Sequence, residues 1–504
     1  MHNNLEKISA PPRASSMVEA LRGLGYSTAT ALADIIDNSI SAGADTINIQ
    51  FDWYEGSSTI SILDNGSGMD ASELLSAMRL GDKNPLHERD GDDLGRFGLG
   101  LKTASFSQCR RLTVATKKTG EEENQCLRWD LDVLSDSTED GWYLLRGTHS
   151  GSEKHIEPLD SLQRGTIVVW ERLDRIVTPG FDEQAFFDLI DSVEQHLSMV
   201  FHRYLEGRNP KLTLKINKKA LQPWDPFMMG HPAKPWATST IPMPSEPKVE
   251  LECHVLPHKD KLSKQEYEKA AGPSGWTQQQ GFYVYRNERL LVPGSWLGLR
   301  LGNSSNKDEA HQLARIKLDI SNDADELWKI DIRKSRAQLP PGLRKFLARY
   351  AKETRERARK TFAFRGKVTN RQGSVEIQRI WDRKESPKGT KYSLDRKHPA
   401  IQNLIRNAEH LSEDVNVLLR LIEGTVPVQR IWLDTAENKE APQSGFDSLP
   451  SNGMSEMISV ILKNMVNNQK ITLQQAKESL MTTEPFQDYP ELIRHVSLEN
   501  KNEK

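Results

Sequence analysis

The chain has 504 residues, which suggests about three domains, and its formal net charge of −2 at pH 7 selects neither a nucleic-acid nor a membrane partner. Its cysteines, Cys109, Cys126 and Cys253, show no metal-binding or disulfide spacing, which fits a reducing compartment. The first residues lack the basic and apolar regions of a secretion signal, and no apolar run approaches the ~18 residues of a membrane span. We therefore expect a cytoplasmic protein with no membrane partner.

The first strong pattern is a helix that is predicted to begin near Ser27 or Thr28 and to end at Gly43. Within it, Asp34 and Asn38 lie four residues apart and therefore share a helix face. A solvated polar stripe is the simplest explanation of these side chains. It fits poorly, because the neighbouring positions are apolar, and the pattern favours a polar site on this helix.

Two alternating segments, residues 46–52 and 59–63, are predicted to be strands. The second strand leads into Asp64-Asn-Gly-Ser-Gly-Met69, and Asp70 is a candidate cap for the helix that follows. Asp-Asn-Gly is usually only a turn signal. Here the next element is a helix, so a simple hairpin is the less natural interpretation.

A polar, glycine-rich segment from Gly81 to Asp93 is predicted to be a mobile loop, and it leads into Gly95, Gly98 and Gly100 before another helix. Glycines at such a place let the backbone approach a ligand, and the first amides of the helix can bind an anion. Alone, this pattern is equally typical of an ordinary loop. A strand that opens with Gly165-Thr166 and a helix over 181–205 complete a first domain, residues 1–205.

Four of these features, in this order, resemble the four boxes of the Bergerat-fold (GHKL) ATPases. They are the helix with Asp34 and Asn38, the Asp64-x-Gly-x-Gly turn, the later glycine run and the strand that opens with Gly165-Thr166. These ATPases include type II topoisomerase B subunits, ATP-driven chaperones, histidine kinases and MutL. The segment from Gly95 to Ser105 resembles the MORC ATPases and their bacterial relatives. The resemblance implies an α+β fold: a Bergerat sandwich of helices on a mixed sheet, an S5-like α/β transducer domain and a mainly helical C-terminal region.

The resemblance also assigns roles to individual residues. Asn38 would hold the Mg²⁺ that bridges the phosphates of ATP, and Asp64 would accept the adenine amino group. The other ATP-binding positions would be Gly66, Gly68, Met69, Gly95, Gly98, Leu99, Gly100, Lys102 and Thr166.

One position departs from the better-known families, in which a Glu four residues before the magnesium-binding Asn is the general base. This chain has Asp34 instead. Its carboxylate can still orient and deprotonate water, but the shorter side chain must lie closer to that water. We therefore expect slow hydrolysis, with Asp37 as the second choice of base.

The second predicted domain, residues 206–365, mixes alternating strands with helices and resembles the transducer of the same ATPases. In the family, a transducer-loop lysine contacts the γ-phosphate. Lys334 is the best match, with Arg333 and Arg336 as alternatives. Such a cation would stabilise the transferring phosphoryl group, whereas a solvated basic loop would not.

Basic residues then follow one another from Arg344 to Arg371. A solvated helix face and a DNA-backbone footprint both explain such a run. The remaining residues, 366–504, are predicted to be mostly helical and to serve dimer or protein-partner contacts.

Together these features predict a Mg-ATP-dependent molecular switch in which ATP closes the lid and brings two copies together as a homodimer. The resemblance implies action on DNA, in a bacterial restriction-like or antiphage defence setting. The alternatives are a histidine-kinase-type enzyme, a chaperone-type ATPase and a non-hydrolysing ATP-binding scaffold.

Overall fold

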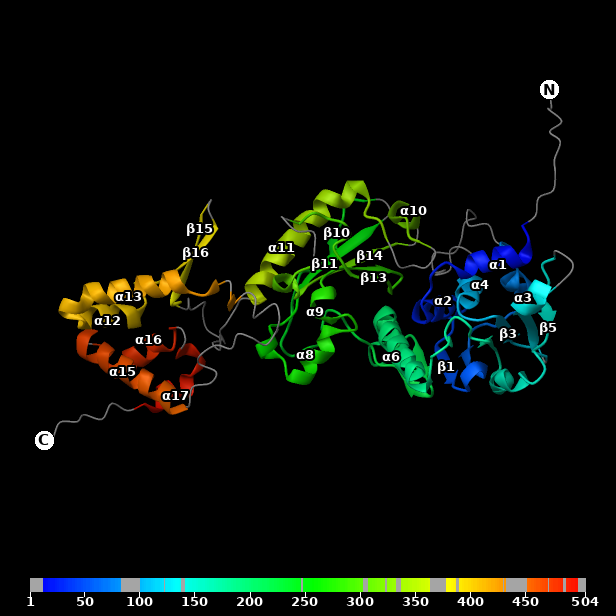
Figure 1. The fold of residues 1–504 in the computed structure, drawn as a ribbon, viewed down its shortest axis with the longest axis horizontal. Coiled ribbons are helices and arrows are strands. Elements are labelled where there is room, and N and C mark those ends of the chain that lie inside the picture. Colours follow the sequence, from blue (N-terminus) through cyan, green and yellow to red (C-terminus); the bar gives the residue numbers. More distant parts are fainter. Residues whose placement is uncertain are drawn as a thin grey trace, which may run out of the picture. The chain divides into compact units, whose positions relative to one another are not determined.

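The structure is a computed structural model. It describes residues 12–82, 100–121, 123–136, 141–245, 248–301, 307–321, 324–331, 337–362, 378–386, 389–428, 430–431, 451–469, 471–483 and 486–496. The chain forms two compact units, Met1–Phe364 and Arg365–Lys504 (Figure 1). The first unit contains two separate sheets. The division of the chain into three domains therefore stays a prediction. Within the described residues, every helix is too short or too polar to span a lipid bilayer.

The first sheet has eight strands in the order β5-β4-β3-β6-β2-β1-β7-β8. Its strands are β1 (Thr46–Asp52), β2 (Thr59–Asp64), β3 (Arg111–Lys117), β4 (Gln125–Asp130), β5 (Leu145–Arg146), β6 (Gly165–Glu171), β7 (Thr213–Ile216) and β8 (Lys219–Ala220). Neighbours run antiparallel except β1 and β7, which are parallel, so the sheet is mixed.

Helices cover one face of this sheet. They are α1 (Ala14–Arg22), α2 (Thr28–Ser41), α3 (Ala71–Met78), α4 (Gly100–Phe106), α5 (Leu131–Asp136), α6 (Glu183–Val200) and α7 (His202–Leu205). Alternate strand residues such as Ile47, Ile49 and Ile62 point into the core beneath the helices, where they are almost fully buried. The predicted α+β class with helices on a mixed sheet is confirmed.

The second sheet is smaller and also mixed, in the order β10-β11-β14-β12-β13, with β9 beside β11. Its strands are β9 (Trp236–Ala237), β10 (Ile241–Pro242), β11 (Val249–Val255), β12 (Gly281–Arg286), β13 (Arg289–Ser295) and β14 (Ala314–Ile320). Its helices are α8 (Lys264–Ala271), α9 (Gly275–Gln278), α10 (Asp325–Trp328) and α11 (Arg344–Phe362), and α11 packs on β11 and β14 (Figure 1).

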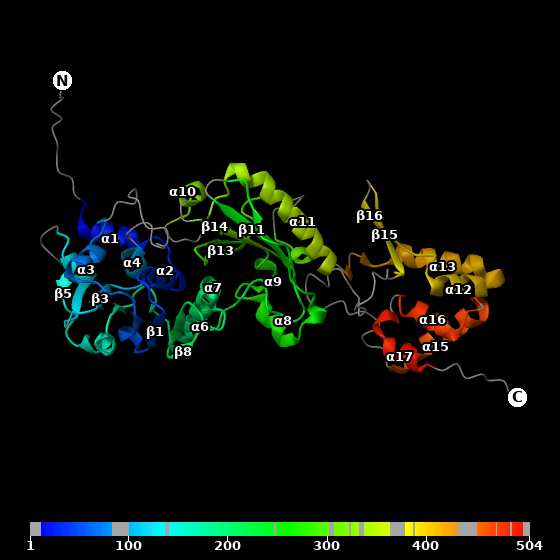
Figure 2. The same cartoon turned by 180° about the vertical axis from the view of Figure 1, so that it is seen from behind.

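The two sheets of the first unit meet through α6 and α7. The predicted single helix over 181–205 is two helices, because Phe201 has φ −104° and ψ 14°, outside the α-helical range. Helix α6 contacts both α2 and β13 (Figure 2). In α7, His202 hydrogen-bonds the Tyr285 hydroxyl at 2.7 Å, and the Tyr204 hydroxyl donates to the Asn287 carbonyl at 2.5 Å. The second sheet is therefore fastened to the first by specific contacts.

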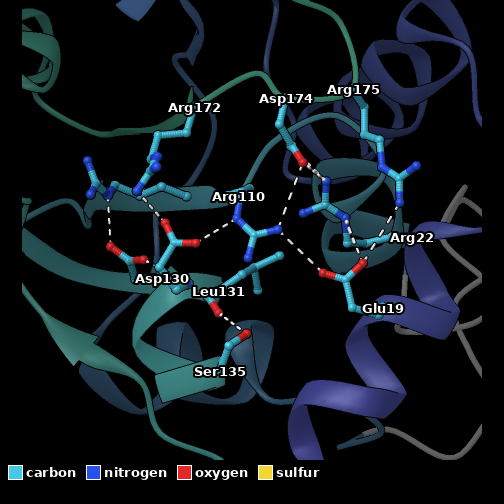
Figure 3. Close-up of polar contacts among 11 residues, drawn as sticks. Glu19, Arg22, Arg110, Asp130, Leu131, Ser135, Arg172, Asp174 and Arg175 are labelled. Carbon is cyan, nitrogen blue, oxygen red and sulfur yellow. Dashed lines mark hydrogen bonds and ion pairs between the residues drawn. The ribbon is translucent and has the colours of Figure 1, made fainter. Parts of the chain in front are cut away.

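A network of arginines and carboxylates fixes α1 to residues beside the start of β3 and after the end of β6 (Figure 3). We call it the arginine clasp; its members are Glu19, Arg22, Arg110, Asp132, Arg172, Asp174 and Arg175. The buried Arg22 donates to both Asp174 oxygens at 2.7 and 2.6 Å. Arg110 reaches Asp132 at 2.7 Å and Glu19 at 3.4 Å. The N-terminal helix is thus held by ion pairs as well as by its apolar face.

The unit Arg365–Lys504 holds a short hairpin and a group of helices. They are β15 (Trp381–Ser386), β16 (Gly389–Leu394), α12 (Pro399–Asn407), α13 (Ser412–Thr425), α15 (Ser451–Gln469), α16 (Leu473–Leu480) and α17 (Pro490–His495). One apolar core lies between α15, α16 and α17, and a smaller one lies between β16, α12 and α13. The described part of this unit is thus mainly helical, as predicted.

Candidate functional site

Helix α2 carries the first predicted site residues. It begins at Ser27, whose hydroxyl accepts from the Thr30 amide while the Thr30 hydroxyl accepts from the Ser27 amide. Asp34 is 2% exposed, whereas Asn38, one turn later, is exposed. A solvated polar stripe is therefore the wrong interpretation for Asp34, and the helix presents one buried carboxylate and one accessible amide in sequence.

The Asp34 carboxylate is held by groups from outside its own helix. The buried Tyr26 hydroxyl donates to Oδ2 at 2.9 Å. Burial, followed by the charge of Asp34, raises the pKa of Tyr26, so this hydroxyl keeps its proton and stays a donor. Gly100, the first residue of α4, has no side chain, and a Cβ there would lie 4.0 Å from Oδ2. Asp34 therefore borders the N-terminus of α4, where the predicted lid ends.

Asp37, the second choice of base, is already paired. It is fully buried, and the Nε of Arg289 on β13 donates to its two oxygens at 3.2 and 3.1 Å. The Nη2 of the same arginine lies 4.0 Å from Oδ1 of Asp34. Arg289 was not predicted as a site residue. Its only sequence signal is a charged residue that opens an otherwise apolar strand.

Asp64 ends β2 and is buried against neutral donors. The Ser39 hydroxyl donates to Oδ2 at 2.7 Å, and the Gly66 amide donates to Oδ1 at 2.8 Å. Burial raises the pKa of Asp64 above its ordinary value, and these hydrogen bonds oppose the rise in part. A buried carboxyl beside a glycine turn is suited to receive a hydrogen-bond donor from a ligand.

A hydroxyl pair beside Asp64 connects two strands. Thr116 on β3 lies opposite Thr166 on β6, with their hydroxyl oxygens 3.0 Å apart. The Thr116 hydroxyl donates to the Gly165 carbonyl and accepts from the Met69 amide at 2.9 Å. Thr116 was missed, although a threonine facing inward on a strand is a recognisable signal. It fixes the segment that carries Met69 against the strand that carries Thr166.

Gly68 allows the closest backbone approach in this turn. Its φ is +68°, and an added Cβ would fall 1.9 Å from the Lys117 carbonyl oxygen. Any other residue would therefore meet both unfavourable backbone geometry and a steric clash. Gly66 is also tight, since a Cβ there would meet the Asp64 carboxylate at 3.0 Å. The structure thus explains why glycine occupies these two positions, and their predicted role in ATP binding stays a prediction.

Lys102 lies almost completely buried near the start of α4, and its Nζ donates to the Ala77 carbonyl at 2.8 Å. Ala77 belongs to the last turn of α3, where a cation also complements the helix dipole. In this structure Lys102 thus ties α4 to α3, the two helices that flank residues 83–99. Its predicted phosphate contact stays a prediction.

Several predicted residues fall outside the described part of the chain: Gly95, Gly98, Leu99 and Lys334. The described residues next to Lys334 are still informative. The negative charge of Asp331 acts on Tyr26 and adds to the rise of its pKa, after burial and Asp34. Asp331 therefore lies near enough to Tyr26, the partner of Asp34, to act on its charge.

Residues 26–166 match the family described as histidine kinase-, DNA gyrase B-, and HSP90-like ATPase. This range holds α2, the Asp64 turn, the glycine run and the first residues of β6. The four predicted boxes thus lie within one family match.

Three relatives show the range of proteins that share this region. The MutL mismatch repair protein of Elusimicrobium minutum is 31% identical over 124 residues, 24% of this chain and 19% of that protein. The MORC2B ATPase of Mus musculus is 34% identical over 100 residues, 19% of this chain and 10% of that protein. The HtpG chaperone of Hydrogenovibrio crunogenus is 29% identical over 106 residues, 19% of this chain and 17% of that protein. The chain thus spans a fifth or less of each of these relatives, and it carries, in residues 26–166, a domain of the GHKL ATPase family.

Proposed function

We propose that this chain is a Mg-ATP-dependent molecular switch, in which ATP binding and slow hydrolysis close the lid between Gly81 and Gly100 and bring two copies together. One observation carries the proposal: α2 presents a buried Asp34 and an exposed Asn38 one turn apart, beside the start of α4 at Gly100. The closeness of a candidate base to a candidate phosphate-binding helix terminus, with a candidate metal ligand on the next turn, supports an ATP site here.

The residues present fit the nucleotide. Asp64 offers a buried acceptor for the adenine amino group, Gly66 and Gly68 allow the tight turn of the backbone that follows it, and Thr166 supports Asp64 from β6. Asn38 would hold Mg²⁺, whose charge neutralises phosphate oxygens when it is bound. Gly95, Gly98, Leu99, Gly100 and Lys102 would complete the phosphate side.

For hydrolysis, Asp34 would orient a water molecule and accept its proton. Tyr26 donates to one carboxylate oxygen and so fixes the rotation of the group. The short side chain restricts where that water can lie, which is why we expect a slow enzyme. Lys334 would contribute a positive charge, and the influence of Asp331, three residues earlier, on Tyr26 supports that assignment.

The test is Asp34→Asn, which keeps the shape of the side chain and removes its basicity. We expect phosphate release to fall by about 100-fold or more, the usual contribution of a general base, while binding of a non-hydrolysable ATP analogue stays within about twofold. Asp191→Asn, an exposed carboxylate on α6, is the control. Equal phosphate release by Asp34→Asn and wild type would remove Asp34 from the mechanism. Light scattering with the analogue checks for the dimer.

We propose DNA as the partner, through the exposed face of α11. Lys345, Arg349 and Lys352 are exposed there at helical spacing. Arg355, in contrast, is buried and donates to Asp308 at 3.0 Å, so it is occupied within the protein. The surface proposed to contact DNA therefore includes fewer basic residues than the basic run in the sequence.

The DNA test reverses three of the exposed positive charges of α11, those of Lys345, Arg349 and Lys352, to Glu. We expect weaker duplex binding and a log affinity–log salt slope reduced by about 2–3, since each phosphate contact contributes roughly 0.9. The control reverses Lys259, Lys261 and Lys264, which are exposed elsewhere in the same unit. If both triple variants lose affinity equally, only net charge matters and α11 is not a docking face.

A further inference from the structure

We infer that Arg289 is a positioning residue that couples the place of the second sheet to the orientation of the Asp34 carboxylate. This inference rests on the proposed role of Asp34 in hydrolysis. It concerns how an arginine of the second sheet helps to hold that carboxylate. Arg289 and its partner Asp37 lie 252 residues apart along the chain.

The guanidinium of Arg289 is fixed by three groups at once. Its Nε faces both oxygens of Asp37 at 3.2 and 3.1 Å, and its Nη1 donates to the Leu290 carbonyl of its own strand at 3.0 Å. Its Nη2 then lies 4.0 Å from Oδ1 of Asp34. The guanidinium belongs to a residue of β13 and hydrogen-bonds a residue of α2. Its position beside Asp34 therefore depends on where β13 lies.

Asp34 and Asp37 are three residues apart on α2, and their side chains are 2% and 0% exposed. Two buried carboxylates so close together repel each other, and each needs compensation from nearby charges or donors. Arg289 supplies one cation to both. It therefore limits the repulsion between them and favours one orientation of each carboxylate.

The two oxygens of Asp34 face different parts of the unit. Oδ2 accepts from Tyr26, which precedes α2, whereas Oδ1 faces Arg289 on the second sheet. A shift of β13 would alter one of these contacts and leave the other. The carboxylate would then turn, and its alignment with a water molecule would change with the position of the second sheet. A misplacement of about 1 Å is enough to change a rate ~100-fold.

The structure also offers a matched control at the same interface. Arg203 on α7 pairs with Asp319 of β14 at 2.5 Å and approaches Glu288 at 3.8 Å, so it also joins the first part of the unit to the second sheet. Its ion-pair partners are Asp319 and Glu288, and neither Asp34 nor Asp37 is among them. Loss of Arg203 therefore loosens the same junction without removing a charge beside the site.

The kinetic test compares Arg289→Gln with Arg203→Gln. We expect Arg289→Gln to lower kcat for phosphate release by about tenfold or more with ATP-analogue affinity within about twofold, because orientation is lost and binding is not. We expect Arg203→Gln to keep kcat within about twofold on the same grounds. An equal loss in both variants would show a general effect of the junction and overturn the inference.

A second variant guards against a folding defect. Arg289→Gln leaves Asp37 buried without this cation, whereas the double variant Asp37→Asn with Arg289→Gln places two amides there instead. We expect the double variant to fold and to remain slow, because Asp34 still lacks the neighbouring cation. Full recovery of kcat would mean that Arg289 serves only to neutralise Asp37, and the coupling to Asp34 would be wrong.

Hydrogen exchange gives a readout that does not need hydrolysis. In the nucleotide-free protein, we expect Arg289→Gln to raise exchange over residues 28–41 more than Arg203→Gln does. Equal exchange in the two variants would overturn the inference. If the wild-type chain binds ATP but releases no phosphate, the proposed function fails, and this measurement still decides whether Arg289 holds α2.

Discussion

Two arginines in the first unit hold helices in different ways. Arg22 of the arginine clasp and Arg289 both bind a carboxylate far away in the sequence. The partner of Arg22, Asp174, is 36% exposed, whereas the partner of Arg289, Asp37, is fully buried. Water can therefore solvate Asp174 if its arginine is lost, and it cannot reach Asp37. The first contact joins a buried arginine to an acid that water can reach, whereas the second is required by the burial of its acid.

The largest effect is expected when each arginine is replaced and the local stability of the helix that it holds is measured. Arg289→Met removes a cation from beside a fully buried carboxylate and should destabilise α2 by about 3–5 kcal/mol, whereas Arg22→Met should destabilise α1 by about 1 kcal/mol. Exchange free energies of amides in the two helices measure both losses. If Arg22→Met costs as much as Arg289→Met, partial exposure of the acid is not what distinguishes the two sites.

Salt should separate them further. The clasp includes half-exposed members such as Glu19 and Arg175, so its contribution is screened by ions. We expect protection of α1 to fall by up to about 1 kcal/mol between low and high ionic strength, and protection of α2 to change less. Exchange measured at two sodium chloride concentrations tests this. A larger decline in α2 would contradict the comparison.

A third buried carboxyl, Asp64, extends the comparison, since the partners the structure gives it are neutral donors. Its raised pKa means that the folded protein binds this proton more tightly than the unfolded chain. Its contribution to stability is therefore present below the ordinary carboxyl pKa and is lost as pH rises through the folded pKa.

Asp64→Asn removes this titration. We expect the variant to be more stable than wild type by roughly 1 kcal/mol at pH 7, with the difference vanishing at low pH, and to lose ATP binding. Thermal unfolding from acid to neutral pH, with and without the ATP analogue, measures both effects. An equal pH dependence in the two proteins would show that Asp64 does not titrate in this range.

The elements around the site follow from local sequence. Ser27 caps α2 and Asp70 caps α3, and both were visible as capping residues before hydrophobic segments. The hairpin of β12 and β13 turns at Asn287 and Glu288, which both take positive φ, a conformation that asparagine tolerates better than most residues. Helix caps, turns and periodicity act over a few residues, so a sequence can display them.

The contacts that decide the chemistry were not all visible. Arg289 meets Asp37 only because the second sheet lies against α2, and spacing along the chain carries no record of that contact. The basic run likewise gave no sign that Arg355 turns inward to Asp308 while Lys352 stays outside. Thr116 gains its role only through its opposite partner, Thr166. Each depends on how separate elements pack.

The bond from Lys102 to Ala77 has a consequence for how this protein can vary. Asp82 is also held near its helix, by Ser76 at 2.5 Å, so both ends of residues 83–99 start from fixed points. When the ends of a loop are fixed by the fold, doubling its length costs only about 0.6 kcal/mol of closure entropy. Insertions between Asp82 and Gly95 should therefore be tolerated by the fold, while the ATP-binding positions that follow and the helices α3 and α4 keep their places.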